Sequence, residues 1–308
     1  MPDQPSVLDE SMSRRRVLTI GGGAVLASLG LSVGGIEWAR RTAAARAAGA
    51  APPAAVASTA TPTATRNPED DQPWPPPPIG VSPDVPTVFS FDVASGVPAD
   101  EEQLMRQSAI FARDYFHRRT GAYLSNRPRI HLNMSRTQGP LGEAGGGDIT
   151  LLIGNRVWPR LERVDKIAVV CHEVFHLYQF ALAKGASSPI LWLIEGAAEY
   201  ASQMAVIESG MRTKLDFERS KLREVVASPQ PPLVIAGRDP NATEYALGAL
   251  AADQLAGDRG VPVFADYYRR LADMAPLAAF EAAFGETRGA FEARFEAWRV
   301  QRGIPARA

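Results

Sequence analysis

The stretch Cys171-His172-Glu173-Val174-Phe175-His176 lies inside a segment, residues 162–184, that contains neither glycine nor proline. Such a segment predicts a helix, and residues four apart on a helix share one face, with Cβ atoms about 6 Å apart. The imidazoles of His172 and His176 can therefore occupy two corners of a zinc tetrahedron. Glu173 stands beside them, where a general base takes a proton from the attacking water. The alternative, two unrelated histidines on a buried helix, would leave two polar rings without partners.

A second helix is predicted directly after the first. Gly185 is typical of a helix C-terminus, and Ser188 with Pro189 is typical of an N-cap and first helical residue. Glu195 follows an apolar run, so its carboxylate points into the protein, where zinc would be a suitable partner. Glu199 lies one turn further on the same face and can accept the second N–H of a ligand histidine. A solvated helix residue is the alternative interpretation of Glu199.

Two segments together resemble the gluzincin metallopeptidases, which include the thermolysin-like and aminopeptidase N-like enzymes: His172-Glu173-Val174-Phe175-His176 and Trp192-Leu193-Ile194-Glu195-Gly196. The resemblance covers about residues 160–300 and implies that Glu195 is the third zinc ligand. It also implies that the motif helix lies beneath a small sheet whose edge strand binds substrate. By that analogy residues 149–153 form the edge strand, to which an extended peptide adds by main-chain hydrogen bonds.

A further segment, Glu244-Tyr245-Ala246-Leu247-Gly248-Ala249-Leu250, resembles the Y-x-x-G-x-L pattern of the aminopeptidase N-like enzymes. There the tyrosine donates a hydrogen bond to the oxyanion, so the resemblance assigns this role to Tyr245; an ordinary helix tyrosine is the alternative. The chain has no segment like G-x-M-E-N, which anchors the substrate's free amine in the aminopeptidases. The residues therefore favour hydrolysis at zinc, without favouring aminopeptidase activity. His117 and His131 are expected to be ordinary.

The segments before the metal motif predict a small sheet. Strands are expected at 88–93, 129–134 and 149–153, and a helix is expected at 98–119, which starts with a proline and an acidic run. After residue 160 nearly the whole chain has helical spacing. The expected fold class is α+β: a small N-terminal mixed sheet with a helix, then a mainly helical half, forming a zincin-like metallopeptidase domain over 86–305.

Residues 1–45 have the layout of an export signal. An arginine-rich segment, Ser13-Arg14-Arg15-Arg16-Val17-Leu18, leads into an uncharged stretch, residues 17–36. Together they resemble a twin-arginine signal. That pathway carries folded proteins, so the twin-arginine export machinery is an expected partner. Ala43-Ala44-Ala45 offers a small-residue cleavage site. The alternative is an uncleaved membrane anchor, because twenty uncharged residues can just span a bilayer. Both alternatives place the rest of the chain outside the cytoplasmic membrane.

Composition sets further limits. Residues 46–85 are rich in alanine, proline and threonine, which predicts a disordered linker. Lysine and arginine number 33 against 34 aspartate and glutamate residues, so no basic surface for nucleic acid is expected. The single cysteine, Cys171, excludes an intrachain disulfide.

Together these observations predict an exported zinc-dependent peptidase that acts on peptides or proteins. The alternative is a non-catalytic module, either a zinc-containing scaffold or a surface-tethered binding domain. A structural zinc site has four protein ligands and is typically rich in cysteine, whereas this pattern supplies three ligands without a cysteine. Glu173 discriminates between the two hypotheses, because a structural site has no use for a general base.

Overall fold

The computed structural model describes residues 81–82, 84–125, 127–135, 140–186, 188–227, 229–233 and 242–304. The predicted signal, residues 1–45, and nearly all of the predicted linker, residues 46–85, lie outside these ranges, so both stay predictions. In the ranges that are described, no helix combines the length and the apolar character needed to cross a membrane. The candidate anchor, residues 17–36, is not among them.

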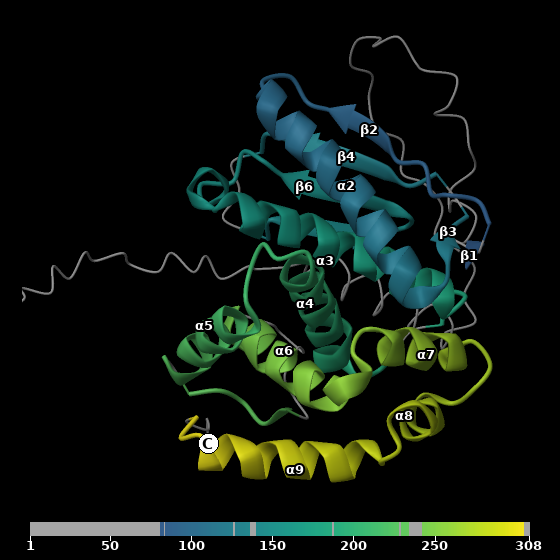
Figure 1. Cartoon of the computed structure of the whole chain (residues 1–308), viewed down its shortest axis with the longest axis vertical. Helices are drawn as coiled ribbons and strands as arrows, with labels where there is room; N and C mark the ends of the chain where they lie inside the picture. Colours follow the sequence, from purple (N-terminus) through teal and green to yellow (C-terminus); the bar gives the residue numbers. More distant parts are fainter. Residues whose placement is uncertain are drawn as a thin grey trace, which may run out of the picture.

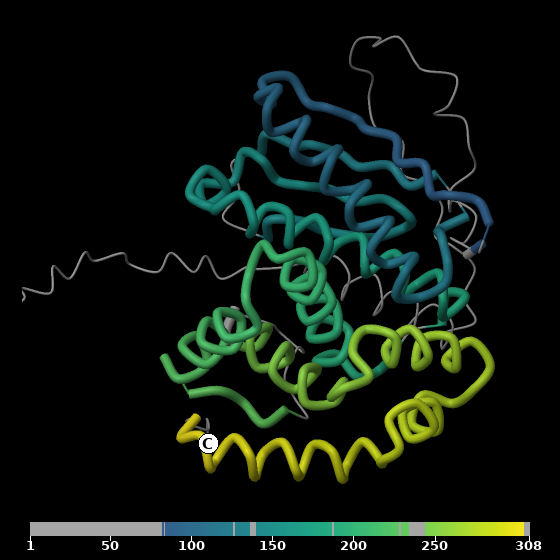
Figure 2. The backbone as a smooth tube through the Cα atoms, viewed as in Figure 1, coloured from purple at the N-terminus to yellow at the C-terminus, as the bar shows by residue number. Residues whose placement is uncertain are grey.

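The chain passes from a sheet-containing part to a helical part (Figure 1, Figure 2). The strands are β1 (Val81–Ser82), β2 (Ser90–Val93), β3 (Tyr123–Leu124), β4 (Arg129–Asn133), β5 (Gly142–Gly145) and β6 (Asp148–Leu152). The α-helices are α2 (Ala99–Thr120), α3 (Arg163–Leu182), α4 (Leu191–Glu208), α5 (Lys214–Val226), α6 (Ala242–Ala256), α7 (Pro262–Leu271), α8 (Pro276–Phe284) and α9 (Arg288–Gln301). Two short 3-10 helices are η2 (Trp158–Arg160) and η4 (Gly257–Arg259). The predicted α+β class is confirmed.

The main sheet has the strand order β2-β4-β6-β5. Strands β2, β4 and β6 run parallel, and β5 runs antiparallel to β6. Alternate residues of β4 and β6 are buried, among them Ile130, Leu132, Ile149 and Leu151, because successive side chains of a strand point to opposite faces. These residues join the side chains of α2 and α3 in one core. The three strands and the helix predicted from the sequence are therefore confirmed within a few residues.

One sequence prediction about the sheet is wrong. Residues 149–153 were expected to form the edge strand, but β6 pairs with β4 on one side and with β5 on the other. The end strand of the main sheet is β5, whose sequence Gly142-Glu143-Ala144-Gly145 contains no β-branched or aromatic residue. Glycine-rich segments are typical of turns, so the pattern concealed this strand. It lies against α3, the helix that carries the metal motif.

Helix α4 lies between α3 and α6 and is the centre of the helical part (Figure 1). A Cβ atom on Gly196 of α4 would lie 2.3 Å from the carbonyl oxygen of Gly248 in α6. The two backbones can approach this closely only because Gly196 lacks a side chain; a Cβ atom on Gly248 would lie 3.1 Å from the carbonyl oxygen of Trp192, which is tight but less severe. The close approach fixes α4 immediately after Glu195.

The C-terminal helices close the helical part with an aromatic core. Phe280, Phe284, Phe291 and Phe295 of α8 and α9 are buried, and the ring of Phe291 stacks on Trp192 of α4 with centroids 5.5 Å apart. The C-terminal helices therefore pack against the helix that carries Glu195.

Candidate metal centre

Helices α3 and α4 carry the predicted metal residues. His172, Glu173 and His176 lie on α3, whereas Glu195 and Glu199 lie on α4. Each of these five residues is at most 2% exposed. Since a buried helix offers its polar side chains no water, these groups need partners inside the protein.

Three ligand atoms converge between the two helices. Nε2 of His172 lies 2.9 Å from Nε2 of His176, and Oε2 of Glu195 lies 3.4 Å and 3.2 Å from these two nitrogens. A tetrahedral zinc ion with bonds of about 2.0–2.2 Å separates its ligand atoms by about 3.3–3.6 Å. Two of the observed separations lie near the lower end of this range, and the two nitrogens are a few tenths of an ångström closer. The three predicted ligands therefore come together, as a group that could hold a metal ion.

The outer nitrogens of both imidazoles face acceptors. Nδ1 of His176 lies 2.8 Å from Oε1 of Gln179, while Nε2 of Gln179 donates to the carbonyl oxygen of Ile194 at 2.8 Å. The second contact fixes which end of the amide faces the ring. Nδ1 of His172 faces Oε2 of Glu199 at 3.3 Å. Each Nδ1 therefore faces an acceptor oxygen, and in the tautomer that carries the ring proton on Nδ1 each Nε2 presents a lone pair to the centre.

This arrangement fits a metal ion. Two nitrogen lone pairs 2.9 Å apart, beside a carboxylate oxygen, need positive charge between them, and two imidazoles with one carboxylate are ligands that zinc prefers. The charged groups around these three atoms also favour a positive charge at this position. Burial alone lowers the pKa of His172, but hydrogen bonds to Glu195 and Glu199 outweigh burial and raise it to about 10. Burial also opposes ionisation of Glu195, yet the two histidines hold the pKa of this carboxyl below its usual value.

Glu173 points towards the end strand of the sheet. A Cβ atom on Gly142 of β5 would lie 2.7 Å from Oε1 of Glu173, so any side chain at this position would displace the carboxylate. Among the described residues neither oxygen of Glu173 has a hydrogen-bond partner. Burial raises the pKa of Glu173 to about 7, against the opposite effect of the two histidines. A carboxyl group with a pKa near neutrality can take up and release a proton, as a general base must.

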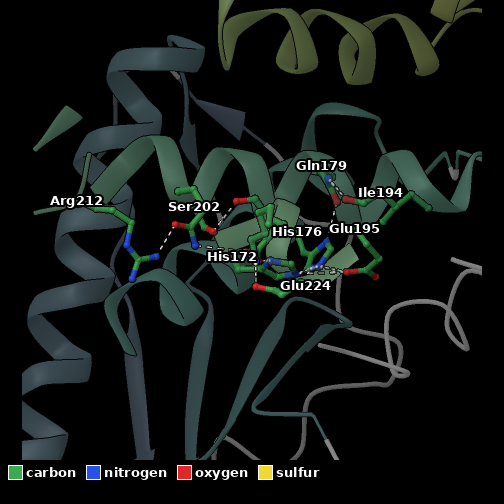
Figure 3. A network of polar contacts seen from close by, with 11 residues as sticks. His172, His176, Gln179, Ile194, Glu195, Ser202, Arg212 and Glu224 are labelled. Carbon is green, nitrogen blue, oxygen red and sulfur yellow. Dashed lines mark hydrogen bonds and ion pairs between the residues drawn. The ribbon is translucent and has the colours of Figure 1, made fainter. Parts of the chain in front are cut away.

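Polar contacts continue behind His172, away from the ligand atoms (Figure 3). Oε1 of Glu199 accepts from Nζ of Lys221 at 2.8 Å and from Nε2 of Gln203 at 3.3 Å. Arg212 donates two hydrogen bonds: from Nη1 to Oε1 of Gln203 at 2.7 Å, and from Nη2 to Oδ1 of Asp165 at 2.5 Å. Although burial opposes it, the ammonium of Lys221 and the ring of His172 hold the pKa of Glu199 far below its usual value. Glu199 is therefore a buried partner of His172, and the alternative interpretation of Glu199 as a solvated helix residue is wrong.

Two tyrosines lie near these helices. Tyr245 is buried on α6, the helix that packs against α4, and its role towards an oxyanion stays a prediction. Tyr268 of α7 was not singled out in the sequence. Burial raises the pKa of Tyr268 well above its usual value, the neighbouring Tyr267 and Glu195 add to this effect, and Gln179 opposes it. Tyr268 is therefore close to Glu195 and to Gln179, the partner of His176.

Sequence reasoning also missed Gln179 and Lys221. Gln179 follows His176 by three residues on a buried helix, and this helical spacing could have indicated it. Nothing in the sequence indicated that Lys221 is buried, because its helix is rich in charged residues and such a pattern predicts a solvent-exposed helix. The other two histidines lie outside the metal group, as predicted: His117 stacks on Tyr123 with centroids 3.7 Å apart, and His131 contacts Asp92 at 3.1 Å.

Comparisons with known proteins give matches among solved structures. No protein-family model matches the chain, and no curated protein matches it. The crystal structure of the E323A mutant of the M1 zinc metallopeptidase from Deinococcus radiodurans matches with a TM-score of 0.49 and 19% identity, covering 72% of this chain. The structure of the M1 zinc metallopeptidase from the same organism matches with a TM-score of 0.47 and 18% identity, covering 75% of this chain. The matched parts cover 52% and 53% of those chains, so this chain spans about half the length of the solved proteins that it resembles.

Proposed function

We propose that this protein is a zinc-dependent peptidase whose metal is held by His172, His176 and Glu195. One observation carries the proposal: three ligand atoms converge at separations of 2.9–3.4 Å, and the buried carboxylate of Glu173 lies beside them without a hydrogen-bond partner among the described residues. A scaffold site would need a fourth protein ligand. Cys171 is buried but is not part of the ligand group.

Each residue has a separate task in this proposal. Zinc at this position would polarise the scissile carbonyl and lower the pKa of water. Glu173 takes the proton of the attacking water and delivers it to the leaving amine. Gln179 and Glu199 keep the two imidazoles in the tautomer that presents Nε2 to the metal. The hydroxyl of Tyr245 is the candidate donor to the oxyanion, and that of Tyr268 is the second candidate.

The end strand β5 supports peptides as the substrate class. An extended peptide can add to the end of a sheet by main-chain hydrogen bonds. Strand β5 is such an end, and its Gly142 brings the strand against Glu173. A peptide added there would have its backbone close to the proposed general base.

We further propose that the protein is exported through the twin-arginine machinery. The support is the sequence Ser13-Arg14-Arg15-Arg16-Val17-Leu18 before an uncharged stretch. Residues 17–36 are either removed with the signal or kept as a membrane tether, and the catalytic part lies outside the cytoplasmic membrane in both cases.

The function is tested by zinc analysis, chelator competition and cleavage of a peptide library. Wild-type protein should bind about one zinc ion per chain. Alanine at His172, His176 or Glu195 should abolish tight binding, whereas Glu199→Ala should weaken it about 10–100-fold. His131→Ala is the matched control, a histidine outside the metal group, and should bind zinc like the wild type.

Two results would contradict the proposal. Full zinc occupancy in the His172, His176 and Glu195 variants would show that the ligands lie elsewhere. Tight zinc binding without cleavage of any peptide would favour the non-catalytic scaffold.

A further inference from the structure

Lys221 is a buried lysine on a helix whose other charged side chains are at least partly exposed. It is 6% exposed, and burial of an ammonium group is costly unless the charge is paired. Its Nζ lies 2.8 Å from Oε1 of Glu199 and 3.5 Å from Oε1 of Glu224. The lysine therefore has carboxylate partners on α4 and on its own helix α5.

The two oxygens of Glu199 face different groups. Oε2 lies 3.3 Å from Nδ1 of His172, and Oε1 lies 2.8 Å from Nζ of Lys221. Glu199 thus stands between the imidazole and the ammonium. Because a carboxylate is planar, the contact at one oxygen restricts the direction of the other.

Helix α5 is fixed in position at its N-terminal end. Thr213 and Asp216 form a capping box there, and Lys214 forms an ion pair with Asp253 of α6. Just before the helix, Arg212 contacts Gln203 of α4 and Asp165 of α3. The approach of Lys221 to Glu199 is therefore determined by contacts to three neighbouring helices.

We propose that Lys221 is a positioning residue for the metal centre: through Glu199 it holds the imidazole of His172 in its metal-binding orientation and so sets the metal affinity. The inference rests on the proposed zinc site. Without the ammonium, Oε1 of Glu199 would keep the longer contact to Gln203, 3.3 Å, which restrains the carboxylate less. Loss of a residue that holds a ligand histidine typically weakens metal binding 10–100-fold. Lys221 acts one contact further out, so about a tenfold loss is expected.

The first experiment replaces Lys221 in the full-length protein. Lys221→Met, which keeps the length of the side chain and removes the charge, should raise the dissociation constant for zinc about tenfold in chelator competition. It should also change the visible absorption spectrum of the cobalt(II)-loaded protein, which reports ligand geometry. Lys221→Arg should restore most of the affinity. Arg223→Met, on the same helix but exposed, is the matched control and should bind zinc like the wild type.

A double-mutant cycle then tests the route through Glu199. In a Glu199→Gln background, adding Lys221→Met should change zinc affinity little, since the carboxylate through which the lysine acts is gone. The double variant also keeps the inference testable if Lys221→Met alone does not fold, because it buries no charge at position 199 or at position 221. A further tenfold loss in the Glu199→Gln background would overturn the inference.

Failure of the inference and failure of the proposed function are distinguishable. Folded Lys221→Met that keeps wild-type zinc affinity and the wild-type cobalt spectrum would overturn the inference alone. Absence of tight zinc binding in the wild-type protein would overturn the proposed function, and the inference with it.

Discussion

At the scale of single residues, Glu173 decides between a catalytic and a structural zinc site. Glu173→Gln keeps the shape of the side chain and removes the base, so zinc binding should persist while peptide hydrolysis falls about 10²–10⁴-fold. The measurement is kcat on a cleaved peptide, with zinc content determined on the same sample. Glu162→Gln, an exposed carboxylate at the start of the same helix, should keep wild-type turnover. Normal turnover in zinc-loaded Glu173→Gln would show that another group is the base.

The two buried tyrosines give a second prediction at this scale. Tyr245→Phe removes the hydroxyl that the sequence resemblance assigns to the oxyanion, so kcat should fall about 10²–10³-fold with little change in KM. Tyr268→Phe is the matched variant on the neighbouring helix α7. If the larger loss of kcat occurs in Tyr268→Phe, the roles of the two hydroxyls are exchanged.

The sequence predicted the group of His172, His176 and Glu195, and also Glu199 behind it, but not Gln179 or Lys221. Helical periodicity alone places His172, Glu173 and His176 together. For Glu195, the apolar run before it and the family resemblance indicated the same site. Lys221 reaches Glu199 only because α5 packs behind α4, and this packing depends on contacts far apart in the sequence. Local patterns do not carry such information.

At the scale of elements, the contact between α4 and α6 should be sensitive to one methyl group. Gly196→Ala would place a Cβ atom 2.3 Å from the carbonyl oxygen of Gly248, so the helices must separate. We expect a loss of about 1–3 kcal/mol in the free energy of unfolding, measured by denaturant unfolding. Zinc affinity should fall as well, because Glu195 precedes the displaced residue.

The control for this substitution lies in α9. Around Gly289 of that helix an added Cβ atom meets open space, so Gly289→Ala should leave stability unchanged or raise it by up to about 1 kcal/mol. Equal stabilities of Gly196→Ala and wild type would contradict the close helix contact.

The strands show where pattern reasoning fails at this scale. Strands β4 and β6 were predicted because both are rich in isoleucine and leucine. Strand β5 was missed because it contains two glycines and no residue with high strand propensity, although its Gly142 allows the close passage of Glu173. The position that brings the sheet to the proposed general base is thus the one that the sequence signals least.

At the scale of the whole molecule, export is predicted to depend on Arg14 and Arg15. Replacing both by lysine keeps the charge but removes the arginine pair of the signal, so the protein should stay in the cytoplasm. Cell fractionation measures the outcome. Arg40 and Arg41, a second arginine pair beyond the uncharged stretch, provide the control, and their replacement by lysine should leave export intact. Normal export of the Arg14 and Arg15 variant would indicate a general secretory signal or an anchor.

The burial of the metal ligands has a kinetic consequence. If zinc occupies the proposed site, its release should require α4 to move away from α3, because the three proposed ligands are at most 2% exposed and come from two packed helices. Release should therefore reach a limiting rate, set by local opening, as the concentration of a competing chelator rises. A release rate that grows in proportion to chelator concentration would contradict this. Zinc held in this way would exchange slowly, so zinc acquired before the proposed export would be retained even where free zinc is scarce.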